Sequence, residues 1–276
     1  MNMSISTETV GKLRAGFTAW IQRYGPLIAP EELKYSIMDH GRRREGLAAV
    51  RVWIECGGDP AAASEYTTST ILSVAACYVE IDVVRFLLEN GADVFRATEA
   101  LSACCMSGLF TPVSFQIVTA LLDHGADINY FVENSYNGFR CKSATPLMRA
   151  AWNGRRKLIH LLLRRGAQNL VNSEGRGPVW CALDERGIGS PDIADLFDAV
   201  DRAGSYTAYH REPRVRVLVL RALCEVNRAT PPADDVLRRV ISLPREVFWL
   251  VIQYWHTELD DEPVDNVDEP KDNGDY

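Results

Sequence analysis

Cysteines are the residues of this chain that could most readily bind a metal or act as nucleophiles, and their spacing indicates which of these roles is possible. The 276 residues include seven cysteines and no C-x-x-C pair. Zinc sites usually need such close pairs. Cys104 and Cys105 are adjacent, and they would act as nucleophiles only where their surroundings favour the thiolate. The sequence therefore predicts reduced thiols that mostly lie in the core, with no metal site and no cofactor.

Histidines and carboxylates give no catalytic pattern either. The five histidines are dispersed, and the H-E-x-x-H, G-x-S-x-G and phosphate-loop motifs are missing. Asp123 with Asp127, and Glu80 with Asp82, have the spacing of carboxylate pairs but occupy repeated or solvated positions. We therefore predict that the chain is not an enzyme. A catalytic role would require activation of Cys104–Cys105 or of a buried carboxylate.

The net charge of −7 is concentrated at the carboxyl terminus. Residues 258–276 hold nine acids and one lysine, which leaves 29 basic and 28 acidic residues in a nearly neutral body. This stretch has too few apolar residues to offset the entropy of ordering, so we expect a disordered acidic tail. Basic clusters at 42–44, 155–157 and 164–165 could contact phosphates, an acidic protein or solvent alone. With a neutral body, nucleic-acid binding is the least expected of these.

A recurring five-residue phrase defines the elements that position these side chains. The glycines at 57, 91 and 125 are each 34 residues apart, and Gly166 follows after 41. A period in this range is typical of a solenoid. Apolar residues at i, i+3 and i+4 before each glycine predict a helix that ends there. The phrase reads Glu89-Asn90-Gly91-Ala92-Asp93 and Asp123-His124-Gly125-Ala126-Asp127 in its clearest copies.

A shorter helix is expected upstream of each of these. Its best copy begins at Thr145, which can cap the helix, and Pro146, which suits the first helical position. Together the two helices resemble the ankyrin repeat, whose pattern is T-P-L-H-x-A-A, then G, then L-L-x-x-G-A-D. Ser73, Ser102 and Met148 replace the histidine of that motif, and Val79 replaces its middle glycine. We expect the Thr–His hydrogen bonds of the motif to be missing.

The resemblance implies an all-α, ankyrin-repeat solenoid. We expect an N-terminal helical cap over 1–32, about five repeats over 33–205 with degenerate ends, a C-terminal helical module over 206–257 and the tail over 258–276. Gly57, Gly91, Gly125, Gly166, Thr145 and Pro146 are the repeat-defining structural residues.

Two insertions enlarge the third unit, one near 110–112 and one after Gly125. The second contains Asn137-Gly138 between aromatic residues, a strong hairpin-turn signal. In ankyrin arrays this connection is the projecting finger, and aromatic side chains contribute large contact areas at interfaces. The residues expected to bind a partner are Tyr130, Phe131, Tyr136, Phe139 and Arg140. Alternatively, these aromatics fold back over the edge of the stack.

Past Gly204 the repeat is lost, and helices are expected over 214–227, over 236–241 and from Leu243 onward. The last segment resembles the start of an F-box (PRANC-like), a module that docks on the Skp1 adaptor of a cullin ubiquitin ligase. Its docking residues would be Leu243, Pro244, Glu246, Val247 and Ile252. Leu220 and Cys224, followed by Leu243-Pro244, also resemble a SOCS box, which binds elongins and a cullin. A third possibility is that these helices only cap the repeats.

These patterns predict an intracellular protein–protein interaction module. The first hypothesis is a substrate-recruiting adaptor of a cullin-type ligase, with Skp1- or elongin/cullin-type partners. The alternative is a non-catalytic scaffold or inhibitor. No stretch approaches the roughly 20 apolar residues of a membrane span, and the amino terminus lacks a signal region. We therefore expect a monomer in the cytoplasm or nucleus that does not contact membranes.

Overall fold

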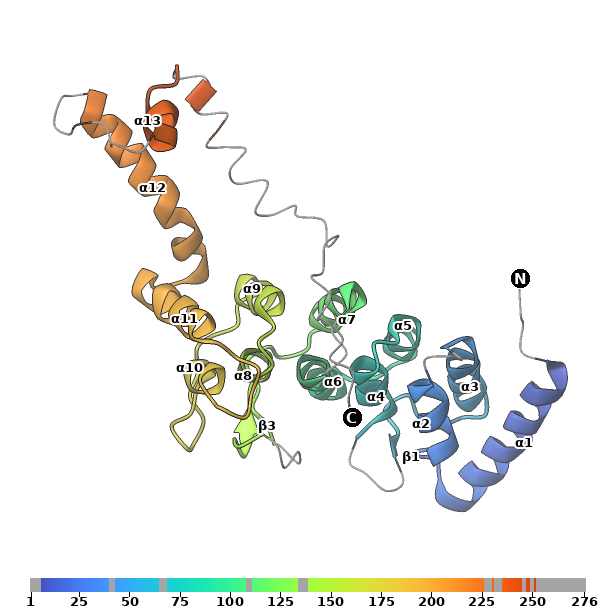
Figure 1. Cartoon of the computed structure of the whole chain (residues 1–276). Coiled ribbons are helices and arrows are strands. Elements are labelled where there is room, and N and C mark those ends of the chain that lie inside the picture. The colour runs from blue at the N-terminus through green and yellow to red at the C-terminus, as the bar shows by residue number, and fades with distance from the viewer. Residues whose placement is uncertain are drawn as a thin grey trace, which may run out of the picture. The chain divides into compact units, whose positions relative to one another are not determined.

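The chain divides into two compact units in the computed structural model, one ending at Phe197 and the other beginning at Asp198. The first is a stack of helix pairs, and the described residues of the second include two further helices (Figure 1). The structure describes residues 6–39, 43–64, 69–107, 111–133, 139–225, 230, 235–244, 247–248 and 251.

Helix pairs build the first unit, and each pair is one copy of the repeat. The division between the two units falls inside the last helix of the last pair. The pairs are α2 (Glu31–Met38) with α3 (Arg43–Glu55), α4 (Ile71–Cys77) with α5 (Ile81–Glu89), α6 (Val94–Met106) with α7 (Pro112–Asp123), α8 (Pro146–Trp152) with α9 (Arg156–Arg164), and α10 (Pro178–Ala182) with α11 (Pro191–Ala203). The predicted all-α solenoid of paired helices is confirmed.

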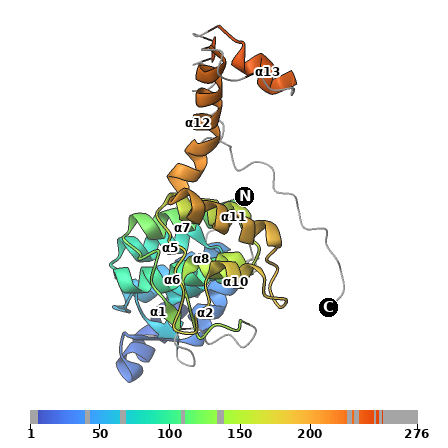
Figure 2. The ribbon, with the colours of Figure 1, turned by 90° about the vertical axis from the view of Figure 1, so that its left-hand side faces the viewer.

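The first helices of successive pairs form one continuous row. α2 packs on α4, α4 on α6, α6 on α8 and α8 on α10, while α3, α5 and α7 form a second row (Figure 1). In Figure 2, turned by 90°, the helix pairs of the first compact unit lie one behind another. Every residue from Ile71 to Ala76 in α4 is buried, because both neighbouring units and its own partner helix cover it. The core is therefore continuous along the stack, as the repeat requires.

A left-handed glycine ends each regular second helix. Gly91 after α5 has φ of 97°, and the next amide, of Ala92, donates to the Leu87 carbonyl at 3.1 Å. This is the six-to-one bond of a Schellman motif, which a residue without a Cβ forms at least cost. The same bond recurs at Gly58–Trp53, Ala126–Leu121 and Ala167–Leu162. The recurring phrase is thus the sequence of a helix end.

The turn between α4 and α5 has a valine, not a glycine, in the left-handed conformation. Val79 has φ of 62°, and Gly154 at the same place in the fourth unit has φ of 64°. Both turns close with equivalent bonds, since the Glu80 amide donates to Ala75 at 2.9 Å and the Arg155 amide to Ala150 at 3.0 Å. A β-branched residue is strained at positive φ. Val79 is only 4% exposed, so burial of its side chain offsets the strain.

The connection after the third pair contains a β-hairpin. β3 (Val132–Glu133) pairs antiparallel with β4 (Ser143–Ala144), with Val132 opposite Ala144. The Asn137-Gly138 turn lies outside the described residues, and the flanking strands run in the directions that this dipeptide favours. The connection before α6 is short by contrast. The Asp93 carboxylate accepts the Arg96 amide at 2.7 Å and begins α6 at once.

The first insertion of the third pair lies at the start of α7 and lengthens that helix. α7 has 12 residues, against nine in α5 and nine in α9. At its start the Ser114 hydroxyl accepts the Thr111 amide at 3.1 Å, which helps to fix where the longer helix begins. The first helix of this pair is also longer, with 13 residues in α6 against seven in α4.

The N-terminal end of the stack carries one additional helix. α1 (Thr7–Tyr24) packs against α3, and the Phe17 ring meets Trp53 edge-on at a centroid distance of 5.7 Å. β1 (Ile28–Ala29) then pairs in parallel with β2 (Ala63–Ser64). α1 and β1 lie in the segment predicted as a cap, 1–32, whereas β2 lies in the connection between the first two helix pairs.

The second unit has a small core of its own. α12 (Tyr206–Glu225) packs against α13 (Asp235–Ile241), with Val217 and Phe248 buried. Leu218, Val240 and Leu243 pack against this pair. α12 begins eight residues before the predicted start at Arg214, because the Ser205 hydroxyl accepts the Ala208 amide at 3.1 Å and begins the helix there. The predicted tail, 258–276, lies outside the described residues.

Candidate protein-binding surface

Exposed apolar side chains meet where the third and fourth units join. The Phe95 ring stands edge-on to Tyr130 at a centroid distance of 5.9 Å. Both remain in solvent, with Phe95 49% and Tyr130 42% exposed, and the neighbouring Val94 is 50% exposed. Two partly exposed rings held against each other form a preorganised contact, because little side-chain freedom is left to lose on binding.

Backbone and side-chain hydrogen bonds hold this pair in place. Phe95 lies in the first turn of α6, which Asp93 caps. On the other side, the Asp127 amide donates to the Thr98 hydroxyl of α6 at 2.9 Å, and Asp127 accepts the Asn129 amide at 2.8 Å. Tyr130 therefore follows a turn that is tied to the helix carrying Phe95.

Asn129 continues this tie to the next unit. Its side-chain oxygen accepts the Gln168 amide at 2.9 Å, and its nitrogen donates to the Gly166 carbonyl at 3.4 Å. The backbone amide of Gln168, the eroded residue of the fourth phrase, is thus bound by a side chain of the preceding connection. Val171, which lies five residues after Gly166 as Tyr130 lies five after Gly125, is 64% exposed. The same connection position is apolar and exposed in successive units.

The five residues predicted to contact a partner do not share one environment. Tyr130 is exposed and Phe131 half-buried, whereas Tyr136 lies outside the described residues. Phe139 is only 4% exposed, and its ring packs edge-on against Trp152 of α8 at 5.4 Å. For Phe139 the expectation of a partner contact is wrong, since its ring anchors the base of the hairpin. The alternative that aromatics fold back on the stack holds for this residue.

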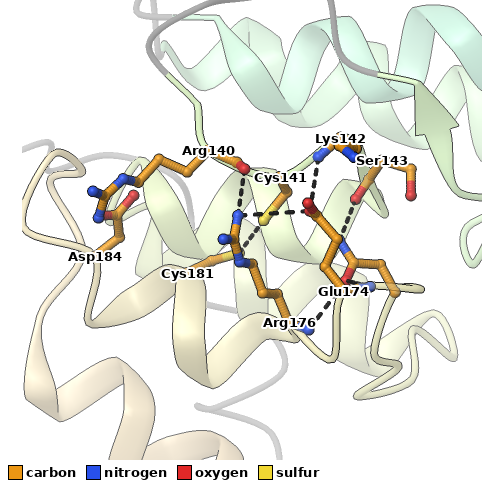
Figure 3. Close-up of polar contacts among 9 residues, drawn as sticks. Arg140, Cys141, Lys142, Ser143, Glu174, Arg176, Cys181 and Asp184 are labelled. Atoms are coloured by element: carbon orange, nitrogen blue, oxygen red, sulfur yellow. Dashed lines mark hydrogen bonds and ion pairs between the residues drawn. The ribbon is translucent and has the colours of Figure 1, made fainter.

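Arg140 belongs to a polar network that joins two neighbouring connections (Figure 3). Its carbonyl accepts a hydrogen bond from Arg176, and its guanidinium lies 3.6 Å from the Asp184 carboxylate. Glu174 accepts the Lys142 amide at 3.1 Å and pairs with Arg176 at 3.6 Å. The segments 140–143 and 172–176 therefore form one fixed surface beside the hairpin.

The network encloses two thiols. The sulfurs of Cys141 and Cys181 are 3.9 Å apart, and both residues are buried. Hydrogen bonding from Cys181 and the positive charge of Arg176 hold the pKa of the Cys141 thiol below its ordinary value, against the effect of burial. The hydrogen bond to Cys141, with burial, raises the pKa of the Cys181 thiol.

Cys104 and Cys105 show the opposite behaviour. Burial raises the pKa of Cys104 to about 12 and that of Cys105 well above its ordinary value. These adjacent thiols stay protonated at neutral pH, so the structure shows no activated nucleophile there. Among the described residues, no group of three or more histidines, cysteines and carboxylates could hold a metal ion.

The residues predicted to dock a ligase adaptor are divided between core and surface. Leu243 packs on the core of Val217 and Phe248, whereas Pro244 is exposed and Val247 is 42% exposed. Glu246 and Ile252 lie outside the described residues. A surface based on this segment would therefore use Pro244 and Val247, with Leu243 supporting them.

The helix pairs, their left-handed glycines and the hairpin connection agree with a comparison to known families. Residues 72–174 match the model of ankyrin repeats, in three copies. This part of the stack has the fold of an ankyrin-repeat solenoid. The ankyrin repeats indicate a protein–protein interaction module. No curated protein matches the chain. No helix in the described part of the chain is long and apolar enough to cross a membrane.

The threonine caps of the ankyrin motif are kept even in repeats where another residue replaces the motif's histidine. Thr145 caps α8 by accepting the Met148 amide at 3.3 Å, with Pro146 in the first turn, as predicted. Thr70 caps α4 in the same way and also donates to the Ser73 hydroxyl at 3.0 Å. Serine in the place of the family's histidine thus keeps one bond of the network that we expected to be missing.

Sequence reasoning missed Phe95 and the Cys141–Cys181 pair. Phe95 is four residues after Gly91, close to the place of Tyr130 after Gly125. Alignment of the phrases places Phe95 opposite Asn129, one position before Tyr130, so it would have indicated that both rings lie near the same place in the connection. Cys141 lies in the hairpin connection and Cys181 lies in α10, so they occupy different positions of their repeats and the repeat spacing gives no signal that pairs them.

Proposed function

We propose that the ankyrin stack binds a target protein through the exposed cluster of Val94, Phe95 and Tyr130. The observation that carries this proposal is the edge-on contact of two half-exposed rings from adjacent units. Fixed aromatic residues are the side chains that dominate binding energy at protein interfaces. The Arg96 guanidinium, 5.7 Å from the Phe95 ring centre, adds a cation beside the apolar surface.

Affinity capture tests the target-binding role. The full chain and its Phe95→Ser/Tyr130→Ser variant are used as baits in the same cell extract, and the bound proteins are compared by quantitative mass spectrometry. The control variant is Leu183→Ser/Ile188→Ser, which removes two apolar side chains that are at least as exposed but lie in the fifth unit. We expect proteins retained by wild type and control to be lost from the first variant. A first variant that retains every one of them would contradict the proposal.

The finer proposal is that the second unit connects this target to a cullin-type ubiquitin ligase. The exposed Pro244 and Val247 next to a folded core support it, because a docking surface needs apolar side chains on a stable base. Skp1-type and elongin/cullin-type components are the two partner classes that fit the resemblances. The free state of all seven cysteines supports a cytoplasmic or nuclear location for the protein.

Direct binding to purified Skp1 and to purified elongin–cullin complexes tests this connection. Val247→Asp places a charge on the exposed segment without removing a core side chain, and Ile188→Asp is the matched control in the repeat stack. We expect Val247→Asp to abolish binding to one of the two complexes and Ile188→Asp to leave it unchanged. If the wild-type chain binds neither complex, the ligase connection is wrong.

A scaffold without ligase contacts is the second candidate. The burial of Phe248 and the packing of Leu243 against it favour this candidate, since these side chains stabilise the second unit itself. It predicts target capture by the stack with no binding to either ligase component. The two experiments together separate the candidates.

A further inference from the structure

We propose that Cys141 and Cys181 form a redox-active pair that hydrogen peroxide converts into a disulfide between the hairpin base and α10. The sulfur atoms are already 3.9 Å apart and need to approach by about 1.9 Å to reach bonding distance. This pair is independent of the target-binding surface and of the ligase connection.

The surroundings of Cys141 favour its thiolate. Arg176 faces it and is held by the Arg140 carbonyl and by Glu174, while its guanidinium also lies 4.4 Å from the Trp180 ring centre. Arg149 of α8 places a second positive charge near Cys141. Glu174 opposes this effect, and Asp184 acts on Cys181. A thiolate beside two cations, with a second thiol in contact, is the arrangement of a reacting and a resolving cysteine.

Cys141 lies close to the protein surface. Cys141 is buried, yet it lies in the loop before β4 between two exposed residues, Arg140 and Lys142. A small neutral oxidant needs only a local movement of this loop to reach the sulfur. Cys104 and Cys105 are both buried inside α6 rather than in a loop. Proximity to the surface and thiolate character together select Cys141.

The proposed reaction takes two steps. The Cys141 thiolate attacks one peroxide oxygen, the O–O bond breaks, and the departing hydroxide takes a proton to become water. Cys181 then attacks the sulfur of the resulting sulfenic acid, the S–O bond breaks, and the leaving hydroxide takes the proton of the Cys181 thiol. One peroxide is reduced to two waters while two thiols are oxidised to one disulfide. A dithiol such as dithiothreitol reverses the change by exchange.

Mass spectrometry of the full chain tests the proposal. After brief exposure to hydrogen peroxide, we expect the seven free thiols to fall by two, with loss of the mass of two hydrogen atoms and a linked peptide joining Cys141 and Cys181. Dithiothreitol should restore all seven. Cys141→Ser and Cys181→Ser should each prevent the linkage, whereas the control Cys104→Ser should form it normally. Seven unchanged thiols, or linkage through other cysteines, would overturn the proposal.

Trapping separates the roles of the two sulfurs. In Cys181→Ser the reaction should stop at the sulfenic acid, so a dimedone adduct should appear on Cys141. In Cys141→Ser little adduct should appear on Cys181. An adduct that forms equally fast on Cys181 would overturn the assignment of Cys141 as the attacking thiol.

The role of Arg176 has a readout that loss of stability alone would not produce. Arg176→Gln should slow formation of the disulfide roughly tenfold at neutral pH and shift the rate–pH profile to higher pH, because less thiolate is present. Arg176→Lys should restore the wild-type profile. Circular dichroism of each variant checks that the helices are intact. An unshifted profile in Arg176→Gln would contradict charge stabilisation by this residue.

Discussion

At Val79 a single residue shows how packing and backbone conformation compete. The fourth repeat has Gly154 at this turn, and the second repeat closes the same hydrogen bonds with a valine at φ of 62°. Burial of the side chain stabilises the fold by about 1.5–3 kcal/mol, and the left-handed backbone costs about 1–2 kcal/mol. The valine is tolerated because the first quantity is the larger.

This balance predicts an unusual order of stability at position 79. Val79→Ala loses buried methyl groups but keeps the strain, whereas Val79→Gly loses slightly more surface and removes the strain. We expect Val79→Gly to be more stable than Val79→Ala by about 1 kcal/mol, measured by urea unfolding. At Val84, buried in α5, the same pair of changes should give the usual order, with glycine about 1 kcal/mol below alanine. Alanine above glycine at both positions would show that Val79 is unstrained.

At the scale of the element, the hairpin connection contains side chains with two different tasks. Tyr130 precedes β3 and is exposed, whereas Phe139 follows the turn and packs on Trp152. The sequence predicted the hairpin, because a dipeptide such as Asn137-Gly138 acts locally. It could not distinguish the two rings, since burial of Phe139 depends on Trp152 of the next helix.

Alanine substitutions in the hairpin connection should separate these tasks. Phe139→Ala should lower the free energy of unfolding by about 3–5 kcal/mol, because it leaves a cavity against Trp152. Tyr130→Ala should change it by less than about 1 kcal/mol, because that ring is partly in solvent. Equilibrium denaturation at one temperature measures both. Equal losses in the two variants would mean that Tyr130 is as important for folding as Phe139.

Across the whole molecule, periodicity made the stack predictable and left its exceptions unexplained. Glycine spacing predicted the helix pairs because each unit repeats the same helix end. Contacts that cross between units, such as Phe95 with Tyr130 and Cys141 with Cys181, depend on the three-dimensional repeat distance and were not predicted. In the second unit no repeat is available, and the predicted start of α12 was wrong because a single hydroxyl, that of Ser205, sets it.

The division into two compact units predicts local responses to mutation. Leu121→Ala, in the core of the stack, should speed amide hydrogen exchange in α5, α6 and α7, which pack together. Phe248→Ala should speed exchange in α12 and α13 instead and leave α5 unchanged, because Phe248 is buried in the core of the second unit. Hydrogen exchange followed by mass spectrometry on the full chain measures both. Uniform acceleration across the chain in either variant would show that the two units unfold as one.

Three side-chain hydrogen bonds each join neighbouring repeats: Thr98 of α6 accepts the Asp127 amide, Asn129 accepts the Gln168 amide, and Asn172 donates to the Ser143 carbonyl. Under mechanical tension applied at the ends of the repeat region, each junction would therefore bear the load through its own few bonds. The stack should lengthen in steps of one repeat and shorten again by the same steps when the tension falls. Such a chain would behave as a reversible spring whose weakest junction sets the force of the first step.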